Sequence, residues 1–256
     1  MRAVILTAGG ATRLRPLTEL TPKCLLPVAG RQILRRAVDT LLSVGMTELV
    51  VVTGYRAGQV RRALESWFPG LAVTFVDNPA WARTNNADSL YLAGPATCGE
   101  PFLLLDGDIV FHAETVRQLL DHGQTCLALR AVGDIGLEEV KVRAGAGGRI
   151  DAIGKDVPVP EACGESVGIE LFTAEDGARL FAVLGERIVA RGQIGEYYEA
   201  AFQEMLDSGT VMTAVAMNHD AGAYAMEIDT ARDLSAAEAL VTAAEIAATE
   251  PVSEVA

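Results

Sequence analysis

The stretch Leu6-Thr-Ala-Gly-Gly-Ala-Thr-Arg-Leu-Arg-Pro-Leu-Thr18, continued by Thr21-Pro-Lys-Cys-Leu-Leu-Pro-Val28, decides how the N-terminal part folds. It begins at the end of an apolar strand expected at 2–7 and continues as a loop of small residues. The backbone N–H groups of such a loop can approach a ligand closely. Loops of this kind bind nucleotides and phosphates. Arg13 and Lys23 could neutralise the phosphate charge. The stretch therefore predicts an anion site at the end of the first strand, with an ordinary glycine turn as the alternative.

Two common nucleotide-binding motifs do not occur in this stretch. The Walker pattern GxxxxGK[ST] is absent, as is the dinucleotide pattern GxGxxG, which would need a helix directly after the glycines. Pro16 and Pro22 instead keep the loop extended, because the residue before a proline avoids the helical region. A nicotinamide-dependent oxidoreductase is therefore disfavoured.

The first half of the chain alternates short apolar segments with amphipathic ones. Strands are expected at 2–7, 49–53, 72–76, 102–105 and 125–131, and helices at 31–45, 57–67, 86–93 and 113–122. Continuous apolar strands separated by helices are typical of a mostly parallel sheet that is covered on both faces. The sequence predicts an α/β fold: a Rossmann-like, three-layer α/β/α arrangement around a mixed, mostly parallel sheet.

The pattern changes after about residue 135. Shorter strands joined by glycine-rich turns are expected at 140–143, 149–153 and 166–172, then helices at 174–188 and 196–208, a strand at 211–216 and a helix at 230–247. We expect one domain, 1–248, followed by a tail at 249–256. Within the domain, a nucleotide-binding part would span about 1–134. A small β-rich part at about 135–228, which could bind the acceptor (the second substrate) or act as a lid, would precede the helix 230–247.

Charge and composition exclude several classes of protein. The net charge of −13 argues against a nucleic-acid binder, yet residues 1–36 carry seven basic side chains and one acidic one, which suggests a local anion site. The longest apolar runs are strand-sized, so no membrane span is expected. No targeting signal is apparent and the four cysteines are widely spaced, so a cytoplasmic protein with reduced thiols is expected.

A second motif, Leu103-Leu-Leu-Asp-Gly-Asp-Ile-Val-Phe111, carries two carboxylates at the end of an apolar strand. Open α/β sheets bind ligands at this end of their strands. Asp106 and Asp108 suit Mg²⁺, which takes oxygen ligands and is commonly shared with substrate phosphates. An acidic turn without a ligand is the alternative.

The N-terminal stretch resembles the signature GxGTRLxPLTxxxPKxLLPV of the nucleotidyltransferase superfamily, which includes MobA-like NTP transferases and the enzymes that activate sugar phosphates and phosphocholine. Ala11 departs from the signature, but alanine here is familiar among phosphocholine-type cytidylyltransferases. The resemblance implies a nucleotide held by the loop residues Ala8, Gly9, Gly10 and Thr12, with Arg13 and Lys23 on its phosphates. It makes Arg13, Lys23 and Asp108 the catalytic residues.

The same resemblance implies a bound metal ion. The superfamily pairs its strand-end aspartate with a second aspartate in a short E-I-D turn before the last helix, which predicts Asp108 and Asp229 as ligands of Mg²⁺. Asp106 is expected to support the nucleotide site. The alternative role for Asp229 is an N-cap of the following helix.

The segment Asn78–Ala93 resembles the phosphocholine and phosphonate cytidylyltransferases. Asn85, Asn86 and Ser89 can hydrogen-bond a base or ribose. The resemblance implies CTP as the nucleotide. Turn chemistry before a helix is the alternative for the paired asparagines.

The acceptor side is expected in the second half of the chain. Lys141 and Lys155 could bind the acceptor phosphate, and Glu165 could contact a cationic or hydroxylated head group. Tyr197 and Glu227 could line the same pocket, while a solvated surface is the alternative for the acidic residues. Phosphocholine, a phosphonate, an amino-alcohol phosphate, a cyclitol phosphate and a sugar phosphate all stay open as acceptors.

Together these features predict a Mg²⁺-dependent cytidylyltransferase that transfers CMP from CTP to a small phosphorylated or phosphonate acceptor and releases pyrophosphate. A hexose-1-phosphate thymidylyl-, uridylyl- or guanylyltransferase is one alternative, and a non-catalytic nucleotide-binding regulator is another. The expected partners are an NTP and the acceptor, without nucleic acid or membrane, and a homodimer is a family-level expectation.

Overall fold

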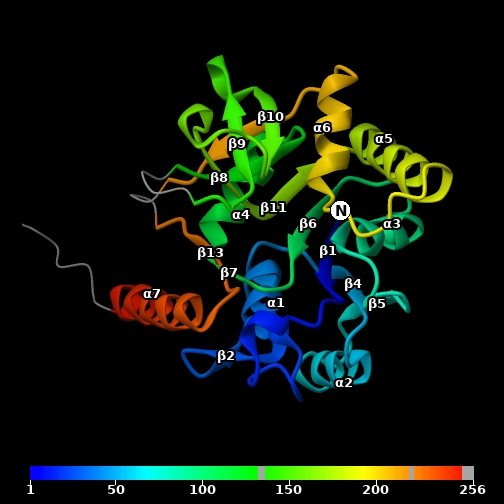
Figure 1. Ribbon diagram of the computed structural model, residues 1–256. Helices are drawn as coiled ribbons and strands as arrows, with labels where there is room; N and C mark the ends of the chain where they lie inside the picture. The colour runs from blue at the N-terminus through cyan, green and yellow to red at the C-terminus, as the bar shows by residue number, and fades with distance from the viewer. Residues whose placement is uncertain (132–135, 219–221, 250–256) are drawn as a thin grey trace, which may run out of the picture.

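The computed structural model describes residues 1–131, 136–218 and 222–249, and its centre is a nine-stranded sheet (Figure 1). The strands are β1 (Arg2–Thr7), β4 (Glu48–Thr53), β5 (Ala72–Asp77), β6 (Phe102–Asp106), β8 (Cys126–Arg130), β9 (Lys141–Ala144), β10 (Ile150–Gly154), β11 (Gly164–Phe172) and β12 (Thr213–Ala216). Seven of them follow the order β10-β9-β11-β6-β1-β4-β5, and β8 pairs with β11 and β12.

The sheet is parallel in its N-terminal half and mixed beyond it. β1 pairs in parallel with β4 and β6, and β4 pairs in parallel with β5. The long strand β11 runs antiparallel to β6, β8 and β9. The predicted α/β fold with a mixed sheet is confirmed.

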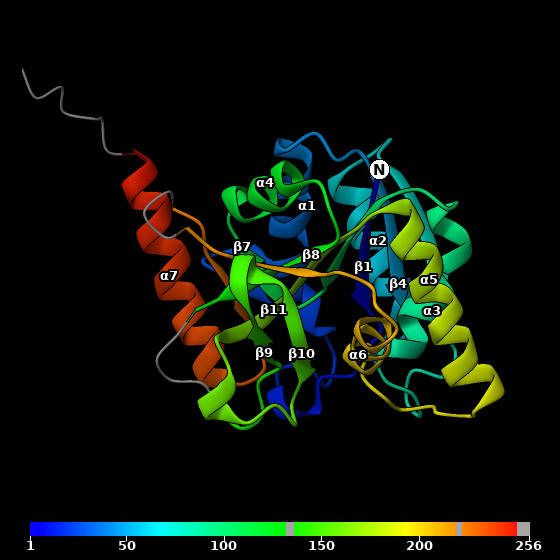
Figure 2. The same cartoon turned by 90° about the horizontal axis from the view of Figure 1, so that it is seen from above.

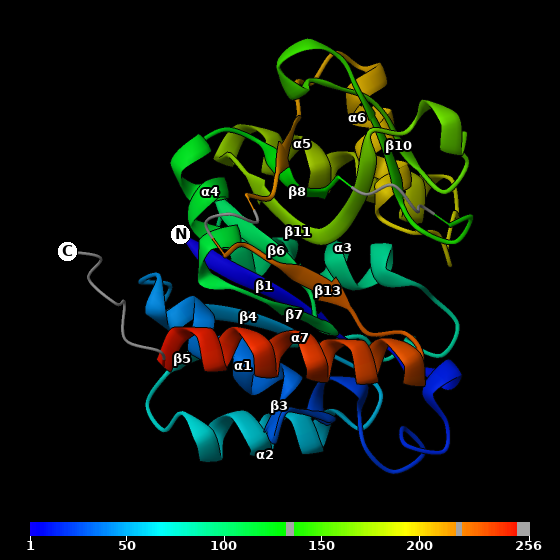
Figure 3. The same ribbon diagram turned by 90° about the vertical axis from the view of Figure 1, so that its left-hand side faces the viewer.

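Helices cover both faces of the sheet. They are α1 (Ile33–Ser43), α2 (Ala57–Trp67), α3 (Asn86–Thr97), α4 (Ala113–His122), α5 (Ala174–Gly185), α6 (Glu199–Asp207) and α7 (Ala231–Thr249). Because side chains alternate along a strand, Ala3 and Ile5 pack with α1, α2 and α4, whereas Val4 and Leu6 pack with α3, α5 and α6. Figure 3 shows α1 and α2 below β1 and β4, and α3 and α5 above them.

Two three-residue strands form a separate ribbon that the sequence did not reveal. β7 (Ile109–Phe111) pairs antiparallel with β13 (Ala225–Glu227). Helix α7 follows this ribbon and lies on the opposite side of the molecule from α3 and α5 (Figure 2). The ribbon therefore joins the end of β6 to a segment near the end of the chain.

Several predicted boundaries change. The helix predicted at 86–93 continues to Thr97, with Pro95 in its last turn. The helix predicted at 174–188 ends at Gly185 and continues as a π-helical turn, Glu186–Ala190. The strand predicted at 211–216 begins at Thr213 and the helix predicted at 196–208 begins at Glu199. A propensity pattern marks where an element lies better than where it ends.

None of the described helices is long and apolar enough to cross a membrane. The predicted division near residue 134 falls at 132–135, outside the described residues, as do residues 250–256 of the predicted tail. The division into a nucleotide part and an acceptor part stays a prediction.

Candidate active site

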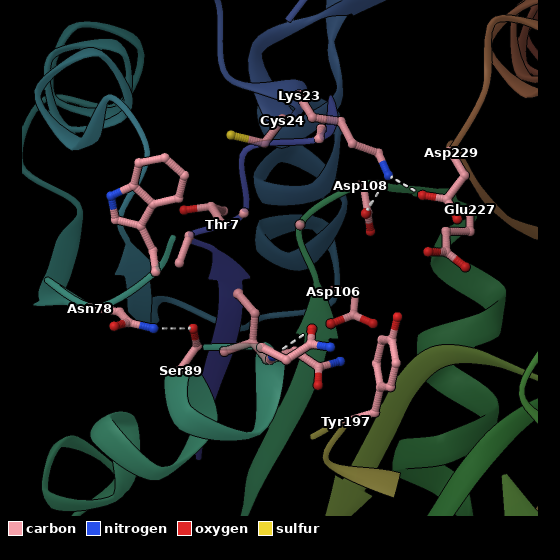
Figure 4. Close-up of a pocket in the computed structure, with 18 of the residues that line it drawn as sticks. Thr7, Lys23, Cys24, Asn78, Ser89, Asp106, Asp108, Tyr197, Glu227 and Asp229 are labelled. Atoms are coloured by element: carbon pink, nitrogen blue, oxygen red, sulfur yellow. Dashed lines mark hydrogen bonds and ion pairs between the residues drawn. The ribbon is translucent and has the colours of Figure 1, made fainter. Parts of the chain in front are cut away.

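A cavity of about 280 Å³ opens at the carboxyl ends of β1 and β6. Its walls come from the loop after β1, the end of β6, the start of α3 and the segment 227–229. Figure 4 shows Lys23, Asp108, Glu227 and Asp229 together on one side, and Asn78 and Ser89 on the other. The location is the one at which open α/β sheets bind ligands.

Three carboxylates gather on the first of these sides. Asp108, Glu227 and Asp229 each offer one oxygen, and the three oxygens lie within 4.8 Å of one another. The ribbon of β7 and β13 brings these carboxylates together. Strand β7 begins directly after Asp108 and pairs with β13, which ends at Glu227, and the N–H of Ile228 donates to the carbonyl of Asp108 at 3.0 Å. Glu227, predicted as an acceptor contact, is thus a third possible metal ligand.

The ammonium group of Lys23 lies between two of these carboxylates. Its Nζ is 2.6 Å from Oδ2 of Asp108 and 2.7 Å from Oδ1 of Asp229, and Nη2 of Arg13 is 2.7 Å from Oδ2 of Asp229. Burial disfavours the charged lysine, but the two carboxylates outweigh it and raise the pKa of Lys23. Lys23 is therefore a cation at the cavity.

The carboxylates fit a hard cation. Oδ1 of Asp108 is buried and has no hydrogen-bond partner among the described residues. A buried carboxylate oxygen without a partner is costly, and a cation beside it would remove that cost. Three carboxylate oxygens in one place are also the donor set that Mg²⁺ prefers.

The N-cap role that was the alternative for Asp229 belongs to its neighbour. Oγ1 of Thr230 accepts from the N–H of Asp233 at 3.3 Å, and Oδ2 of Asp233 accepts from the N–H of Thr230 at 2.7 Å. This reciprocal pair resembles a capping box at the start of α7. The carboxylate of Asp229 is left for Arg13 and Lys23.

The loop after β1 contributes only part of its predicted residues to the cavity. Ala8, Gly9 and Arg13 line it, whereas Gly10 and Thr12 are not among the lining residues. A Cβ on Gly10 would lie 3.0 Å from the Trp81 ring, so this glycine allows the indole to approach the loop. The position of Thr12 is exposed, at the start of a 3₁₀ turn.

Asn85 and Asn86 line the cavity but also have structural partners. Oδ1 of Asn85 accepts from the N–H of Asn86 at the start of α3, and its amide donates to the carbonyl of Gly195 at 3.4 Å. Oδ1 of Asn86 accepts from the N–H of Tyr198 at 3.0 Å. The bond between Asn85 and Asn86 is the local turn chemistry that was the alternative, whereas the other two bonds attach α3 to the segment 195–198.

Ser89 lines the same wall, in a network that the sequence did not reveal. Nδ2 of Asn78 lies 3.1 Å from both Oγ of Ser89 and Oγ1 of Thr84. Asn78, Trp81 and Thr84 also line the cavity. The rule that strand ends carry the ligand site could have indicated them, since they follow the end of β5.

Asp106 also lines the cavity, and its carboxylate accepts a hydrogen bond from Tyr198. The Tyr198 hydroxyl donates to Oδ2 of Asp106 at 2.9 Å. Burial at the strand end, together with the negative charges of Asp108 and Glu170, raises the pKa of Asp106. Tyr198 was not among the predicted site residues.

Two predicted acceptor residues, Lys141 and Glu165, do not line this cavity and have partners elsewhere, and their role in acceptor binding stays a prediction. Lys141 is 1% exposed and its ammonium donates to the carbonyls of Leu137 and Glu139. Glu165 is buried and pairs with Arg130, whose Nε is 2.6 Å away. The burial of Lys141 and its bonds to backbone carbonyls depend on how the chain packs, so the sequence alone does not show them.

The other predicted acceptor residues lie at or near the cavity. Tyr197 and Glu227 line it. Nζ of Lys155 lies 4.6 Å from the centre of the Tyr197 ring, in a neighbouring hollow.

Comparisons with known proteins show the family to which the chain belongs. Residues 3–153 match the family described as the MobA-like NTP transferase domain, and the chain belongs to this family. It is 30% identical over 178 residues to the 2-aminoethylphosphonate cytidylyltransferase of Lancefieldella rimae, covering 70% of this chain and 69% of the relative. It is 38% identical over 119 residues to the CMP-5'-(3-aminopropyl)phosphonate synthase of Streptomyces rubellomurinus, covering 46% of this chain and 19% of the relative.

Curated relatives also include sugar-phosphate uridylyl- and guanylyltransferases. The chain spans between 19% and 48% of the length of the first relatives. The solved structure of the CTP:phosphocholine cytidylyltransferase from Streptococcus pneumoniae shares the fold, with a TM-score of 0.75, 22% identity, and coverage of 94% of this chain and 98% of that one.

Proposed function

We propose that this protein is a metal-dependent cytidylyltransferase, which transfers CMP from CTP to a small phosphonate or phosphorylated acceptor and releases pyrophosphate. One observation carries the proposal: a lysine, an arginine and three carboxylates meet at the carboxyl ends of β1 and β6. Nucleotidyl transfer brings two anions together, so it needs both positive charge and a metal-binding carboxylate set.

The residues have distinct roles in this proposal. Asp108, Asp229 and Glu227 would hold Mg²⁺, which supplies charge neutralisation at the α-phosphate and the acceptor oxygen when it is bound. Lys23 stabilises the negative charge on the α-phosphate, and Arg13 orients the pyrophosphate. The acceptor oxygen is already anionic at neutral pH, so no side chain has to remove a proton from it.

CTP is favoured over other nucleotides by the relatives. The chain covers 69% of a cytidylyltransferase for an aminoalkylphosphonate. A wall of hydrogen-bonding side chains, Asn78, Thr84 and Ser89, faces the cavity where a base and ribose would lie. Sugar-phosphate relatives keep a uridylyl- or guanylyltransferase as the second candidate. The proposal includes a cytoplasmic location and a homodimer.

The test is pyrophosphate release with Mg²⁺ from each NTP against phosphocholine, aminoalkylphosphonates, inositol phosphate and sugar 1-phosphates. We expect acceptor-dependent release with CTP, abolished by EDTA and restored by Mg²⁺. Release only with UTP, dTTP or GTP and a sugar phosphate would replace the proposal by the second candidate. Tight CTP binding without release from any acceptor would favour a regulator. Size-exclusion chromatography with light scattering tests the homodimer.

A further inference from the structure

Tyr55 lies between β4 and α2 and is not among the residues that line the cavity at the ends of β1 and β6. Its backbone and its side chain nevertheless bond to the loop that follows β1. Its N–H donates to the carbonyl of Ala8 at 2.9 Å, and its hydroxyl lies 3.0 Å from the carbonyl oxygen of Thr18 and 2.6 Å from that of Glu19. One residue thus holds both the beginning and a later part of this loop.

The contact with Thr18 continues toward the cavity. Thr18 is buried, and its Oγ1 donates to the carbonyl of Ala11 at 2.7 Å. Ala11 lines the cavity two residues before Arg13, and its backbone is left-handed, with φ 44°. Residues other than glycine are uncommon in this region, so surrounding contacts have to hold the alanine there. A chain of hydrogen bonds therefore leads from Tyr55 through Thr18 to the cavity wall.

Two neighbours of Tyr55 support the same loop. Nη2 of Arg56 donates to the carbonyl of Glu19 at 2.8 Å, and Nε2 of Gln59 donates to the carbonyl of Leu20 at 3.0 Å. Nε of Arg56 also donates to the Tyr55 hydroxyl at 3.0 Å. Because the hydroxyl oxygen accepts this bond, its own proton is directed to the carbonyls of the loop.

The ring of Tyr55 reaches a second wall of the cavity. It meets the Trp81 indole edge to face, with the ring centres 5.2 Å apart and the planes at 60°. Trp81 lines the cavity, and a Cβ on Gly10 would lie 3.0 Å from its ring. The loop and the indole therefore pack on each other, and Tyr55 contacts both of them.

We propose that Tyr55 is a positioning residue, whose hydroxyl holds residues 11–22 in the conformation that presents Arg13 and Lys23 to the nucleotide phosphates. It touches no substrate and acts through the loop. The carbonyls that it holds lie between the two cations in the sequence, so fixing them restricts both side chains. Cations that are placed before the nucleotide arrives reduce the entropy lost on binding. This inference rests on the proposed function, in which both cations act on the phosphates.

The first test is Tyr55→Phe, which removes the hydroxyl and keeps the ring against Trp81. We expect the KM for CTP to rise about fivefold to tenfold, since one hydrogen bond that orders the loop is lost. The KM for the acceptor should stay within about twofold and kcat should fall by less than about threefold, because the bound phosphates then hold the loop. Gln59→Met removes one bond farther along the loop and should raise the KM for CTP less.

Thr125→Val is the matched control for stability. It removes a hydrogen bond of 2.5 Å from a buried hydroxyl to Oδ2 of Asp176, directly before β8. Neither residue lines the cavity. We expect urea unfolding to show a loss of stability similar to that of Tyr55→Phe, with the KM for CTP unchanged.

Hydrogen exchange followed by mass spectrometry gives a readout that needs no turnover. The N–H groups of Leu14, Leu17 and Glu19 are hydrogen-bonded within the loop, so their exchange reports its opening. In the nucleotide-free protein, peptides covering 11–22 should exchange at least about fivefold faster in Tyr55→Phe than in wild type. Saturating CTP should bring the two proteins to the same rate.

The outcomes separate this inference from the proposed function. A KM for CTP within twofold of wild type in Tyr55→Phe, loop exchange at the wild-type rate, or an equal rise in KM in Thr125→Val overturns the inference and leaves the proposed function standing. Absence of release with CTP and any acceptor defeats the proposed function. Loop exchange and calorimetric titration with each NTP still decide the inference then, because wild-type affinity no higher than that of Tyr55→Phe would reject it.

Discussion

The hydroxyl of Tyr198 donates a hydrogen bond of 2.9 Å to Oδ2 of Asp106. The tyrosine ring is fully buried, and burial together with the charge of Asp106 raises its pKa, so the hydroxyl stays a donor. The backbone N–H of Tyr198 donates to Oδ1 of Asn86, which lines the cavity at the ends of β1 and β6. Tyr198 therefore connects the start of α3 to the strand end that precedes Asp108.

Removing this hydroxyl should impair turnover more than nucleotide binding. In Tyr198→Phe we expect kcat to fall about threefold to tenfold and stability to fall by roughly 1 kcal/mol, since one buried hydrogen bond is lost. The KM for CTP should stay within twofold. Steady-state kinetics and urea unfolding measure both, with Tyr91→Phe on α3 as the control. An unchanged kcat would mean that Asp106 does not need this bond.

Lys23 and Asp108 should both be required for turnover. Lys23→Ala and Asp108→Asn should each lower kcat on the order of 10²–10³, the usual effect of losing an electrostatic stabiliser. Arg15→Ala, which changes an exposed cation of the same loop, should stay near wild type. Near-normal turnover in either site variant would reject the assigned roles.

The same pair should affect metal binding in opposite directions. Lys23 contacts the two carboxylates that a metal ion would use, so Lys23→Met should tighten Mn²⁺ binding to the nucleotide-free protein. Asp108→Asn should weaken it. Calorimetry with Mn²⁺ alone is the measurement, and weaker binding in Lys23→Met would show that the lysine does not compete with the ion.

Gly54 should be intolerant of even one added methyl group. A Cβ there would lie 2.7 Å from the carbonyl oxygen of Ala8 and 2.7 Å from Cβ of Trp81, both at the cavity. We expect Gly54→Ala to lose about 1–3 kcal/mol of stability and to weaken CTP binding. Gly58→Ala on α2 meets only the end of the Arg62 side chain and should be neutral or stabilising, by up to about 1 kcal/mol. Equal stabilities of the two variants would contradict this packing.

Glu199 should make stability depend on pH near neutrality. Burial raises its pKa to about 7 in the folded protein, above the ordinary value near 4.5, so folding favours the protonated form. The free energy of unfolding therefore carries no penalty from Glu199 at low pH, and it decreases as the pH rises from about 4.5 through 7, because the buried carboxyl then has to ionise. We expect Glu199→Gln to exceed wild type by on the order of 1–3 kcal/mol at pH 8 and by little at pH 5. Thermal unfolding at both pH values checks this, and a difference independent of pH would contradict it.

Much of the fold could be predicted because its signals are local. Apolar strands such as Leu49–Thr53 and amphipathic helices such as Ala57–Trp67 are visible in their own periodicity. The strand-end rule also predicted Asp106 and Asp108 at one edge of the sheet, where the structure has them. These inferences do not depend on the tertiary contacts between the elements.

The individual roles of several polar residues could not be predicted in this way. The strands β7 and β13 are three residues long, so no periodicity marks them, yet their pairing brings Glu227 to Asp108. Lys141 and Lys155 look alike in the sequence, but one is buried against backbone carbonyls and the other faces a cavity.

The sequence by itself determined the α/β class, the loop of small residues that carries Arg13 and Lys23, and the acidic strand end, because each depends on neighbours along the chain. Only the tertiary structure decided that Lys23 lies between Asp108 and Asp229, that Tyr198 donates to Asp106, and that Oε2 of Glu199 is buried without a hydrogen-bond partner among the described residues. The physical reason is that these relations depend on burial and on pairing between distant segments, and both are properties of the packed molecule.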